Sequence, residues 1–190
     1  MVRAARRPHR PPREAAEPPE ADAAIEIAVR FLGSRPRTRW ELERRLRRAG
    51  AEDPVIDSTL ERLAAMGYVD DAAFVRWWMD QRDRHAPRGR RMIEAELRQH
   101  GVHRDVIAAH AEHDAVGERP PEDELLPTTD EERARIALDR HLRGRPLPAD
   151  ALAVQRVGMF LVRRGFDPET VRSTIRNAAG AGAGAEPESP

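Results

Sequence analysis

The sequence predicts an all-α fold: three tandem three-helix repeats that form an elongated, curved array, with disordered termini. Three observations predict it. No segment alternates β-branched and polar residues over the length of a strand. Helix start and stop signals recur along the chain, and one apolar pattern occurs three times. With 190 residues, 39% of them apolar and 4% aromatic, the chain can build a short helical array but not a large sheet-based enzyme core.

Helix-terminus residues define nine expected helices. Thr38 and Thr129 each open a capping box, with a glutamate three residues later. Asp53 and Asp167 each stand as a cap before a proline at the first helical position, and Asp70 is expected to cap the helix that follows it. Glycines stand where helix C-termini are expected, at Gly33, Gly50, Gly67, Gly101, Gly144 and Gly165. The expected helices span residues 21–32, 38–49, 54–66, 71–84, 89–100, 104–113, 130–142, 150–164 and 168–178.

One apolar pattern recurs around three glycines, Gly50, Gly101 and Gly165. A leucine precedes each glycine by four residues and an aliphatic residue precedes it by eight, so the two lie on one helix face. Another aliphatic residue follows each glycine by six. A three-helix unit of this size buries little by itself and therefore has to stack on its neighbours. The patterned residues are Leu42, Leu46, Ile56, Ile93, Leu97, Ile107, Val157, Leu161 and Val171.

These signals divide the chain into six segments. Composition without periodicity marks the tails and the linker, whereas the repeats carry the apolar pattern. The segments are a disordered basic, Pro-rich tail (1–20), repeat 1 (21–67), repeat 2 (68–114), an acidic Pro-rich linker (115–129), repeat 3 (130–178) and a disordered tail (179–190).

Composition excludes several classes of chemistry. All 33 basic residues are arginine, and 33 acidic residues balance them. Without lysine there is no Schiff-base chemistry and no phosphate-loop lysine, and without cysteine there is no disulfide, thiolate catalysis or Cys-bound zinc. No apolar run approaches the roughly 18 residues of a membrane span. We therefore expect a cytoplasmic protein that is not held in a membrane.

The net charge of zero hides strongly charged segments. Arg35–Arg48 contains seven arginines against two glutamates, and Arg82–Arg91 contains five against one aspartate. Residues 112–132 contain nine acids against one arginine. Because guanidinium groups suit phosphate and carboxylate partners, the basic segments are candidate binding surfaces.

Trp40 lies about 200° around its helix from Leu42, on the side that carries arginines. It could stack a base or anchor a protein partner. Alternatively, it packs on a neighbouring helix and the arginines form a solvated face. The candidate contact residues in the two basic segments are Arg37, Trp40, Arg44, Arg47, Arg48, Arg84, Arg88, Arg90 and Arg91.

Two further groups of residues could suggest a catalytic or metal site, but each has a simpler structural explanation. Asp70 and Asp71 resemble a carboxylate pair, but helix capping explains both. Four histidines, His100, His103, His110 and His113, lie close together in the sequence. His110 and His113 share a helix face and could ligate a metal, but the turn at the glycine between the first two spoils a simple site. We predict no metal, no cofactor and no catalytic residue.

Three segments, taken in order, resemble the bacterial RecX family. The first begins at Arg37 (RTRWEL, then Leu46 and Gly50) and matches the family's R-S/T-x-x-E-L-x-x-x-L-x-x-x-G element. The second comprises DDAAFV from Asp70, Arg82, and RGRRMIEAELRQHGV from Arg88. The third, FLVRRGF, begins at Phe160 and matches F-L-x-R-R-G-F/Y. The resemblance covers residues 21–178, and its motif residues with structural roles are Leu42, Leu46, Gly50, Asp70, Asp71, Phe74, Ile93, Leu97, Gly101, Leu161 and Gly165.

The resemblance implies three tandem three-helix repeats and a regulatory function. RecX proteins are non-enzymatic regulators of the RecA recombinase that lodge along the groove of the RecA–DNA filament. They suppress its ATPase and strand exchange, and they block its extension or favour its disassembly. Some also bind DNA directly.

From the residues and the resemblance together, we expect a cytoplasmic, monomeric regulator of recombination, DNA repair and the SOS response. Its expected partners are the RecA filament and single-stranded DNA, bound directly or within the filament. The alternatives are a stand-alone nucleic-acid-binding helical protein, with a helix-turn-helix-like fold, and a structural repeat scaffold without a RecA role.

Overall fold

The computed structural model describes residues 18–116, 127 and 129–183 of the chain. Within those residues it contains nine helices and no strand, which confirms the all-α prediction. The predicted disorder of residues 1–17 and 184–190, and most of the predicted acidic linker, lie outside the described residues. The helices are α1 Ala21–Leu32, α2 Arg39–Arg48, α3 Asp53–Ala65, α4 Asp71–His85, α5 Arg90–Gln99, α6 Arg104–Val116, α7 Asp130–Leu142, α8 Ala151–Arg163 and α9 Pro168–Ala183.

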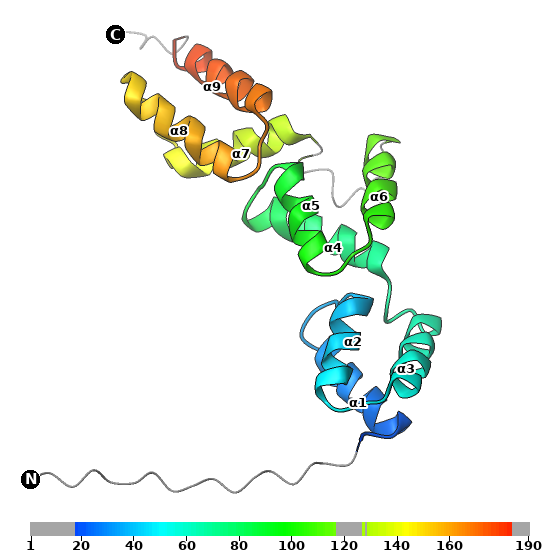
Figure 1. Cartoon of the computed structure of the whole chain (residues 1–190). Coiled ribbons are helices and arrows are strands. Elements are labelled where there is room, and N and C mark those ends of the chain that lie inside the picture. The colour runs from blue at the N-terminus through cyan, green and yellow to red at the C-terminus, as the bar shows by residue number, and fades with distance from the viewer. Residues whose placement is uncertain (1–17, 117–126, 128, 184–190) are drawn as a thin grey trace, which may run out of the picture.

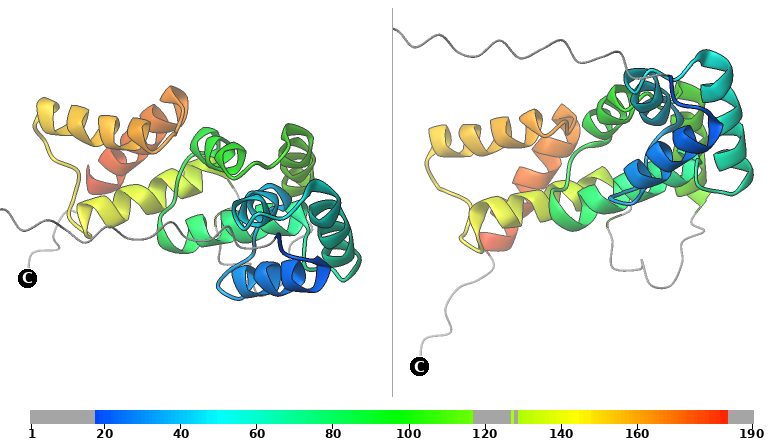
Figure 2. Two further views of the ribbon diagram at one scale, coloured as in Figure 1. Left: turned by 60° about the horizontal axis from the view of Figure 1, so that its bottom comes forward. Right: turned by 90° about the horizontal axis from the view of Figure 1, so that it is seen from below.

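The helices form three groups of three, laid end to end in an elongated, bent column (Figure 1). We call α1–α3, α4–α6 and α7–α9 the first, second and third repeat. Seen from below, α1, α4 and α7 follow one another along one side of the column, and α2, α5 and α8 follow along the other (Figure 2, right). Each repeat has its own cluster of buried apolar residues. The three tandem repeats are therefore confirmed.

The predicted apolar pattern is the core of each repeat. Every one of the nine patterned residues is buried. The glycines that align the pattern, Gly50, Gly101 and Gly165, have φ angles of 88°, 79° and 88°. Glycine reaches this left-handed region without steric cost, so the chain can turn sharply after each second helix.

Most predicted helix caps are present, with one correction. Thr38 and Thr129 both form complete capping boxes, and Asp167 accepts hydrogen bonds from backbone N–H groups in the first turn of α9. Asp53 is not a cap: it is the first residue of α3, and its carboxylate pairs with Arg47 at 3.1 Å. The N-cap is Glu52, whose side chain makes no capping bond.

Two helices run further than predicted, into segments expected to be linker and tail. α6 continues to Val116 and α9 continues to Ala183. The α6 extension, residues 114–116, contains one alanine, and the α9 extension, residues 179–183, contains three alanines and two glycines. Segment boundaries drawn from composition alone therefore place the ends of these helices too early.

Consecutive repeats meet at two junctions that use the same contacts at equivalent positions. At the first junction the backbone N–H of Arg39 donates to Asp71 Oδ1 at 2.9 Å. At the second, the N–H of Arg90 donates to Asp130 Oδ2 at 3.0 Å. The donors are the first residues of α2 and α5, and the acceptors are the first residues of α4 and α7. Each repeat thus supplies a carboxylate to the second helix of the repeat before it.

A second contact also occurs at both junctions. The carbonyl oxygen of His100, the C-cap of α5, accepts a 2.6 Å hydrogen bond from Thr38 Oγ1. The carbonyl oxygen of Arg164, the C-cap of α8, accepts a 2.9 Å hydrogen bond from the N–H of Gly89. Thr38 and Gly89 are the N-caps of α2 and α5. The start of each second helix therefore holds the end of the next repeat's second helix.

Glycine lets the backbones approach at these junctions. A Cβ atom on Gly101 would lie 2.5 Å from side-chain atoms of Trp40, and one on Gly165 would lie 2.4 Å from Met92 Cβ. The equivalent Gly50, in the first of the three described repeats, has no neighbour within 4 Å of such an atom. Gly101 and Gly165 are therefore required for packing between repeats as well as for their backbone conformation.

Candidate protein and nucleic-acid interface

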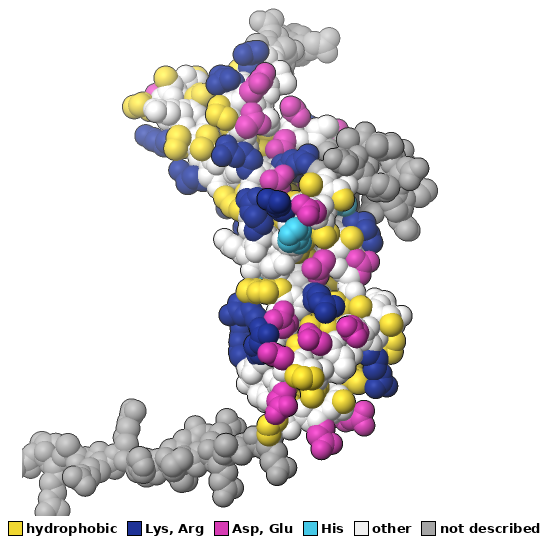
Figure 3. Space-filling view, turned by 45° about the vertical axis from the view of Figure 1, so that its right-hand side comes forward, with side chains coloured by type: hydrophobic (Ala, Val, Ile, Leu, Met, Phe, Trp, Pro, Cys, Tyr) yellow, Lys and Arg dark blue, Asp and Glu magenta, His cyan; other side chains and the backbone are white. Residues whose placement is uncertain are grey.

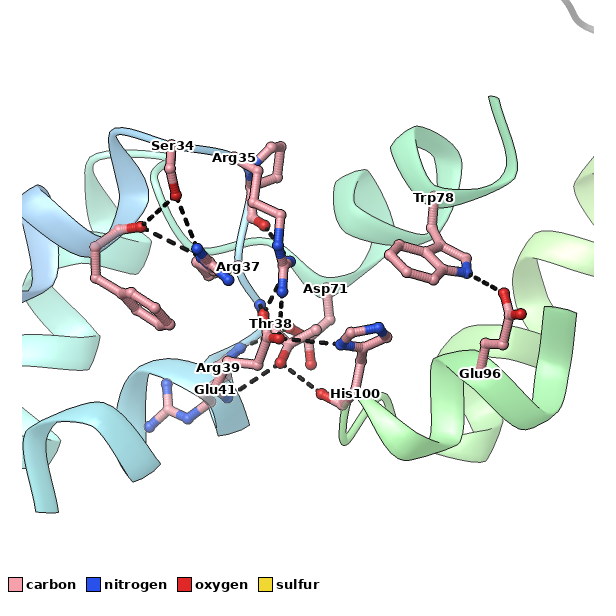
Figure 4. Close-up of polar contacts among 12 residues, drawn as sticks. Ser34, Arg35, Arg37, Thr38, Arg39, Glu41, Asp71, Trp78, Glu96 and His100 are labelled. Atoms are coloured by element: carbon pink, nitrogen blue, oxygen red, sulfur yellow. Dashed lines mark hydrogen bonds and ion pairs between the residues drawn. The ribbon is translucent and has the colours of Figure 1, made fainter. Parts of the chain in front are cut away.

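A closed polar network surrounds the start of α2 at the first junction (Figure 4). The Glu41 carboxylate accepts hydrogen bonds of 2.6 and 3.1 Å from Arg35 and lies 3.0 Å from His100 Nδ1. Burial would raise the pKa of Glu41, but the hydrogen bonds from Arg35 and His100 outweigh it and hold that pKa below its ordinary value. These groups satisfy one another, so the network positions α2 rather than offering a free charge.

The adjacent carboxylates Asp70 and Asp71 are both explained by capping, as predicted, but they cap different helices. Asp70 caps α4, accepting from the N–H groups of Ala72 and Ala73 at 2.8 and 3.0 Å. Asp71 instead accepts from Arg39 at the start of α2. Burial raises the pKa of Asp71 in spite of that bond.

Trp40 both packs on a neighbouring repeat and remains partly exposed, so each of the two interpretations of its position in the sequence holds in part. Its side chain packs on Gly101 of the second repeat. Trp40 nevertheless remains 37% exposed, and the Arg44 guanidinium lies 4.3 Å from its ring centroid. A stacked cation and aromatic ring at the surface can contact a base, a phosphate or a carboxylate.

Two of the predicted contact residues in the first repeat are engaged within the chain. Arg37 donates to the Phe31 carbonyl at 3.3 Å and to Ser34 Oγ at 2.8 Å, and its guanidinium lies 3.9 Å from the Phe31 ring centroid. Burial lowers the pKa of Arg37. Arg47 pairs with Glu43 at 2.5 Å, in addition to its pair with Asp53.

Three of the predicted contact residues in the second repeat also make contacts within the chain. Arg88 is paired with Glu96, and burial is the main cause that lowers the pKa of Arg88. Arg90 pairs with Glu94 at 3.0 Å. The carbonyl oxygen of Arg84 accepts a hydrogen bond from Arg140 of the third repeat.

Three predicted arginines remain open. Arg44, Arg48 and Arg91 are exposed, and none has a carboxylate within 4.0 Å among the described residues. Figure 3 shows basic side chains on all three repeats, interspersed with acidic side chains. The predicted contact residues of the first and second repeats that remain open are therefore Trp40, Arg44, Arg48 and Arg91, which we call the open basic set.

Sequence reasoning missed a buried acid in the second repeat. Glu96 is 7% exposed. It accepts from Trp78 Nε1 at 2.9 Å and from Arg82 Nε at 2.7 Å, and it also pairs with Arg88. The signal was present in the sequence: Glu96 lies three residues after Ile93, on the apolar face of α5. An acid on an apolar face needs charged partners, which these arginines supply.

Sequence reasoning also missed an ion pair across the second junction. Asp83 of α4 accepts hydrogen bonds of 2.8 and 3.2 Å from Arg133 of α7. The two side chains are 0% and 4% exposed. The residues are 50 positions apart, so no local pattern could connect them.

Within the part of the chain that the structure describes, no group of three or more histidines, aspartates and glutamates could hold a metal ion. His100 is engaged with Glu41 and with the ring of Trp78, 4.4 Å away between centroids. The side chain of His113 lies outside the described residues. No helix among the described residues is long and apolar enough to cross a membrane.

Comparison with known proteins matches two segments of the chain to domains of one family. The family model of the first RecX three-helix domain matches residues 24–63, and that of the second matches residues 70–110. The chain is 38% identical over 159 residues to the regulatory protein RecX of Mycobacterium avium, covering 82% of this chain and 84% of that protein. It is 37% identical over 172 residues to the regulatory protein RecX of Thermobifida fusca, covering 87% and 84%.

Solved structures show the same fold. The crystal structure of RecX from Lactobacillus salivarius matches with a TM-score of 0.65 at 14% identity, covering 83% of this chain and 96% of that one. A second crystal structure, of a regulatory protein RecX, matches with a TM-score of 0.58 at 21% identity. At these identities the likeness concerns the arrangement of helices.

Proposed function

The chain belongs to the RecX family of regulatory proteins, and from that premise we propose that it binds the RecA–DNA filament and inhibits RecA. The inhibited activities are ATP hydrolysis, filament extension and strand exchange. The chain acts as a cytoplasmic, non-enzymatic monomer in the regulation of recombination and DNA repair.

The open basic set is the single observation that carries the proposed interface. Trp40, Arg44 and Arg48 of α2 and Arg91 of α5 stand on consecutive repeats. The duplicated junctions fix the repeats relative to one another. A preformed surface loses little conformational entropy when it binds a partner. Guanidinium groups can meet either the carboxylates of a protein or the phosphates of bound DNA, and a recombinase filament presents both.

The test is a RecA ATPase assay on single-stranded DNA, with the full chain as the titrant. We expect inhibition at concentrations near those of RecA. The triple variant R44A/R48A/R91A should need at least ten-fold more protein for half-inhibition. The matched control, R62A/R172A/R176A, removes three exposed arginines from α3 and α9 and should change the half-inhibitory concentration less than two-fold. No inhibition by the native chain at stoichiometric concentrations contradicts the proposal.

The stacked pair of Trp40 and Arg44 favours one alternative, direct binding of single-stranded nucleic acid. A base can stack on an exposed ring beside a guanidinium. In that case the affinity for DNA alone falls steeply with salt, with a log–log slope of about 0.7 per phosphate contacted. The substitution W40A then weakens binding to DNA alone as much as it weakens RecA inhibition.

A further inference from the structure

We propose that a pocket at the second junction is a binding site for phosphate groups. The cavity has a volume of about 300 Å³ and lies where the loop before α5 meets α7 and α8. This size is at the lower end of the range for small-ligand sites. Five of its nine lining residues are arginines or histidines and none is acidic: His85, Arg140, His141, Arg143 and Arg164.

The repeat alignment explains why this space is open. Ala137 lies seven residues after Asp130, as Trp78 lies seven residues after the equivalent Asp71. At the first junction the Trp78 indole packs against the ring of His100. At the second junction the small side chain of Ala137 occupies the equivalent position and leaves the space beside Arg164 unfilled.

The same alignment explains why the pocket lacks a negative charge. Glu96 lies five residues before Gly101, and Phe160 lies five residues before Gly165. Glu96 pairs with two arginines, whereas Phe160 at the equivalent position has no charge and can contact arginines only through its aromatic ring. The Arg164 guanidinium lies 4.7 Å from that ring's centroid, and the His141 ring stacks on it at 3.9 Å. Aromatic faces therefore hold these groups in place without neutralising them.

The pocket arginines are held in place but keep free donors. Arg164 Nη1 donates to the Pro87 carbonyl at 3.1 Å, and Arg140 Nη2 donates to the Arg84 carbonyl at 3.1 Å. A guanidinium has five N–H donors, so each side chain retains several. Arg143 is exposed, and its side chain forms no hydrogen bond or ion pair with the residues that the structure describes.

Positive charge is crowded near the pocket. Burial is the main cause that lowers the pKa of Arg88, and the neighbouring charges of Arg82 and Arg164 lower it further. At the first junction, by contrast, the Glu41 carboxylate pairs with Arg35 and lies 3.0 Å from His100 Nδ1. The pocket lining supplies arginine donors without a carboxylate, and an anion with several oxygens would satisfy them.

The phosphate can come from a free polyphosphate or from a nucleic-acid backbone. Two probes separate these sources: inorganic pyrophosphate, followed by calorimetry, and a fluorescent oligothymidylate, followed by anisotropy. The test variant is R140Q/R143N in the full chain, because asparagine tolerates the left-handed backbone found at Arg143, where φ is 53°. The control, R172Q/R176Q, makes the same change of charge on α9.

We expect the native chain to bind at least one probe, with R140Q/R143N binding it at least ten-fold more weakly and the control changing less than two-fold. Binding of pyrophosphate assigns the pocket to free phosphates, and binding of the oligonucleotide alone assigns it to a nucleic-acid backbone. The single variant R143N changes an exposed position, and we expect it to bind the same probe at least three-fold more weakly than the native chain. Failure of the native chain to bind either probe, or equal loss in the test and control variants, overturns the proposal. These readouts contain no RecA, so they are independent of the proposed RecA inhibition.

Discussion

Thr38 Oγ1 donates a 2.6 Å hydrogen bond to the carbonyl oxygen of His100, 62 positions away, and so joins the first repeat to the second. The same oxygen accepts from the Glu41 N–H within the capping box of α2. One buried hydroxyl therefore stabilises both a helix start and a repeat junction.

The substitution T38A should destabilise the chain more than the loss of a cap alone. Losing a cap costs about 1 kcal/mol, and leaving the partly buried His100 carbonyl unpaired costs about 1–3 kcal/mol more. We expect a total of roughly 2–4 kcal/mol from urea unfolding. T129A is the matched control, because Thr129 forms the same capping box at an exposed position. Equal losses for the two variants would show that the junction bond contributes nothing.

G101A should be more damaging than G50A. Both glycines have left-handed φ angles, so both substitutions carry a backbone cost of about 1–2 kcal/mol. Only at Gly101 would the new methyl group also meet the side chain of Trp40. We expect thermal unfolding to show at least twice the loss for G101A. A smaller loss at Gly101 than at Gly50 would contradict the close packing of the repeats.

Breaking the buried pair of Asp83 and Arg133 should be costly, whereas removing both charges should not. D83L leaves an arginine buried without its carboxylate, at a cost of about 3–5 kcal/mol. The double variant D83L/R133M replaces the pair with apolar side chains and should recover most of that loss. The measurement is a double-mutant cycle in urea. Additive losses in the cycle would mean that the two side chains do not interact.

The stabilising effect of Glu41 should depend on pH. Its pKa in the folded chain is lowered from 4.5. The group therefore contributes stability above about pH 4.5, and that contribution is lost as the pH falls through the folded-state pKa. The difference in unfolding free energy between the native chain and E41Q should be largest near pH 7 and should shrink towards pH 3. A difference that stays constant over this range would contradict the charged network at the first junction.

Local sequence signals predicted the helices and the repeat alignment. Capping boxes and left-handed glycines act within a few residues, and the structure places Thr38, Thr129 and Gly101 in those roles. The error at Asp53 arose because its carboxylate is used by Arg47, a choice between partners that the cap pattern does not encode.

The sequence could not show which arginines stay open at the surface and which are engaged within the chain. Helical periodicity places a side chain only relative to its own helix. From the sequence, Arg37, Arg44 and Arg88 were therefore all predicted as contact residues. Arg37 is bound by a loop and Arg88 by Glu96, while Arg44 stays at the surface. Those differences depend on segments brought together by folding, as does the contact between Asp71 and Arg39, 32 positions apart.

The most direct test of the proposed function compares three ligands for the same labelled full-length chain: the RecA–single-stranded-DNA filament, free RecA and free single-stranded DNA. Fluorescence anisotropy at one salt concentration gives the three affinities. We predict that the filament binds at least ten-fold more tightly than either component, because it presents carboxylates and phosphates together to the open basic set. Equal affinity for free DNA and for the filament, or no binding to the filament, would contradict the proposed function.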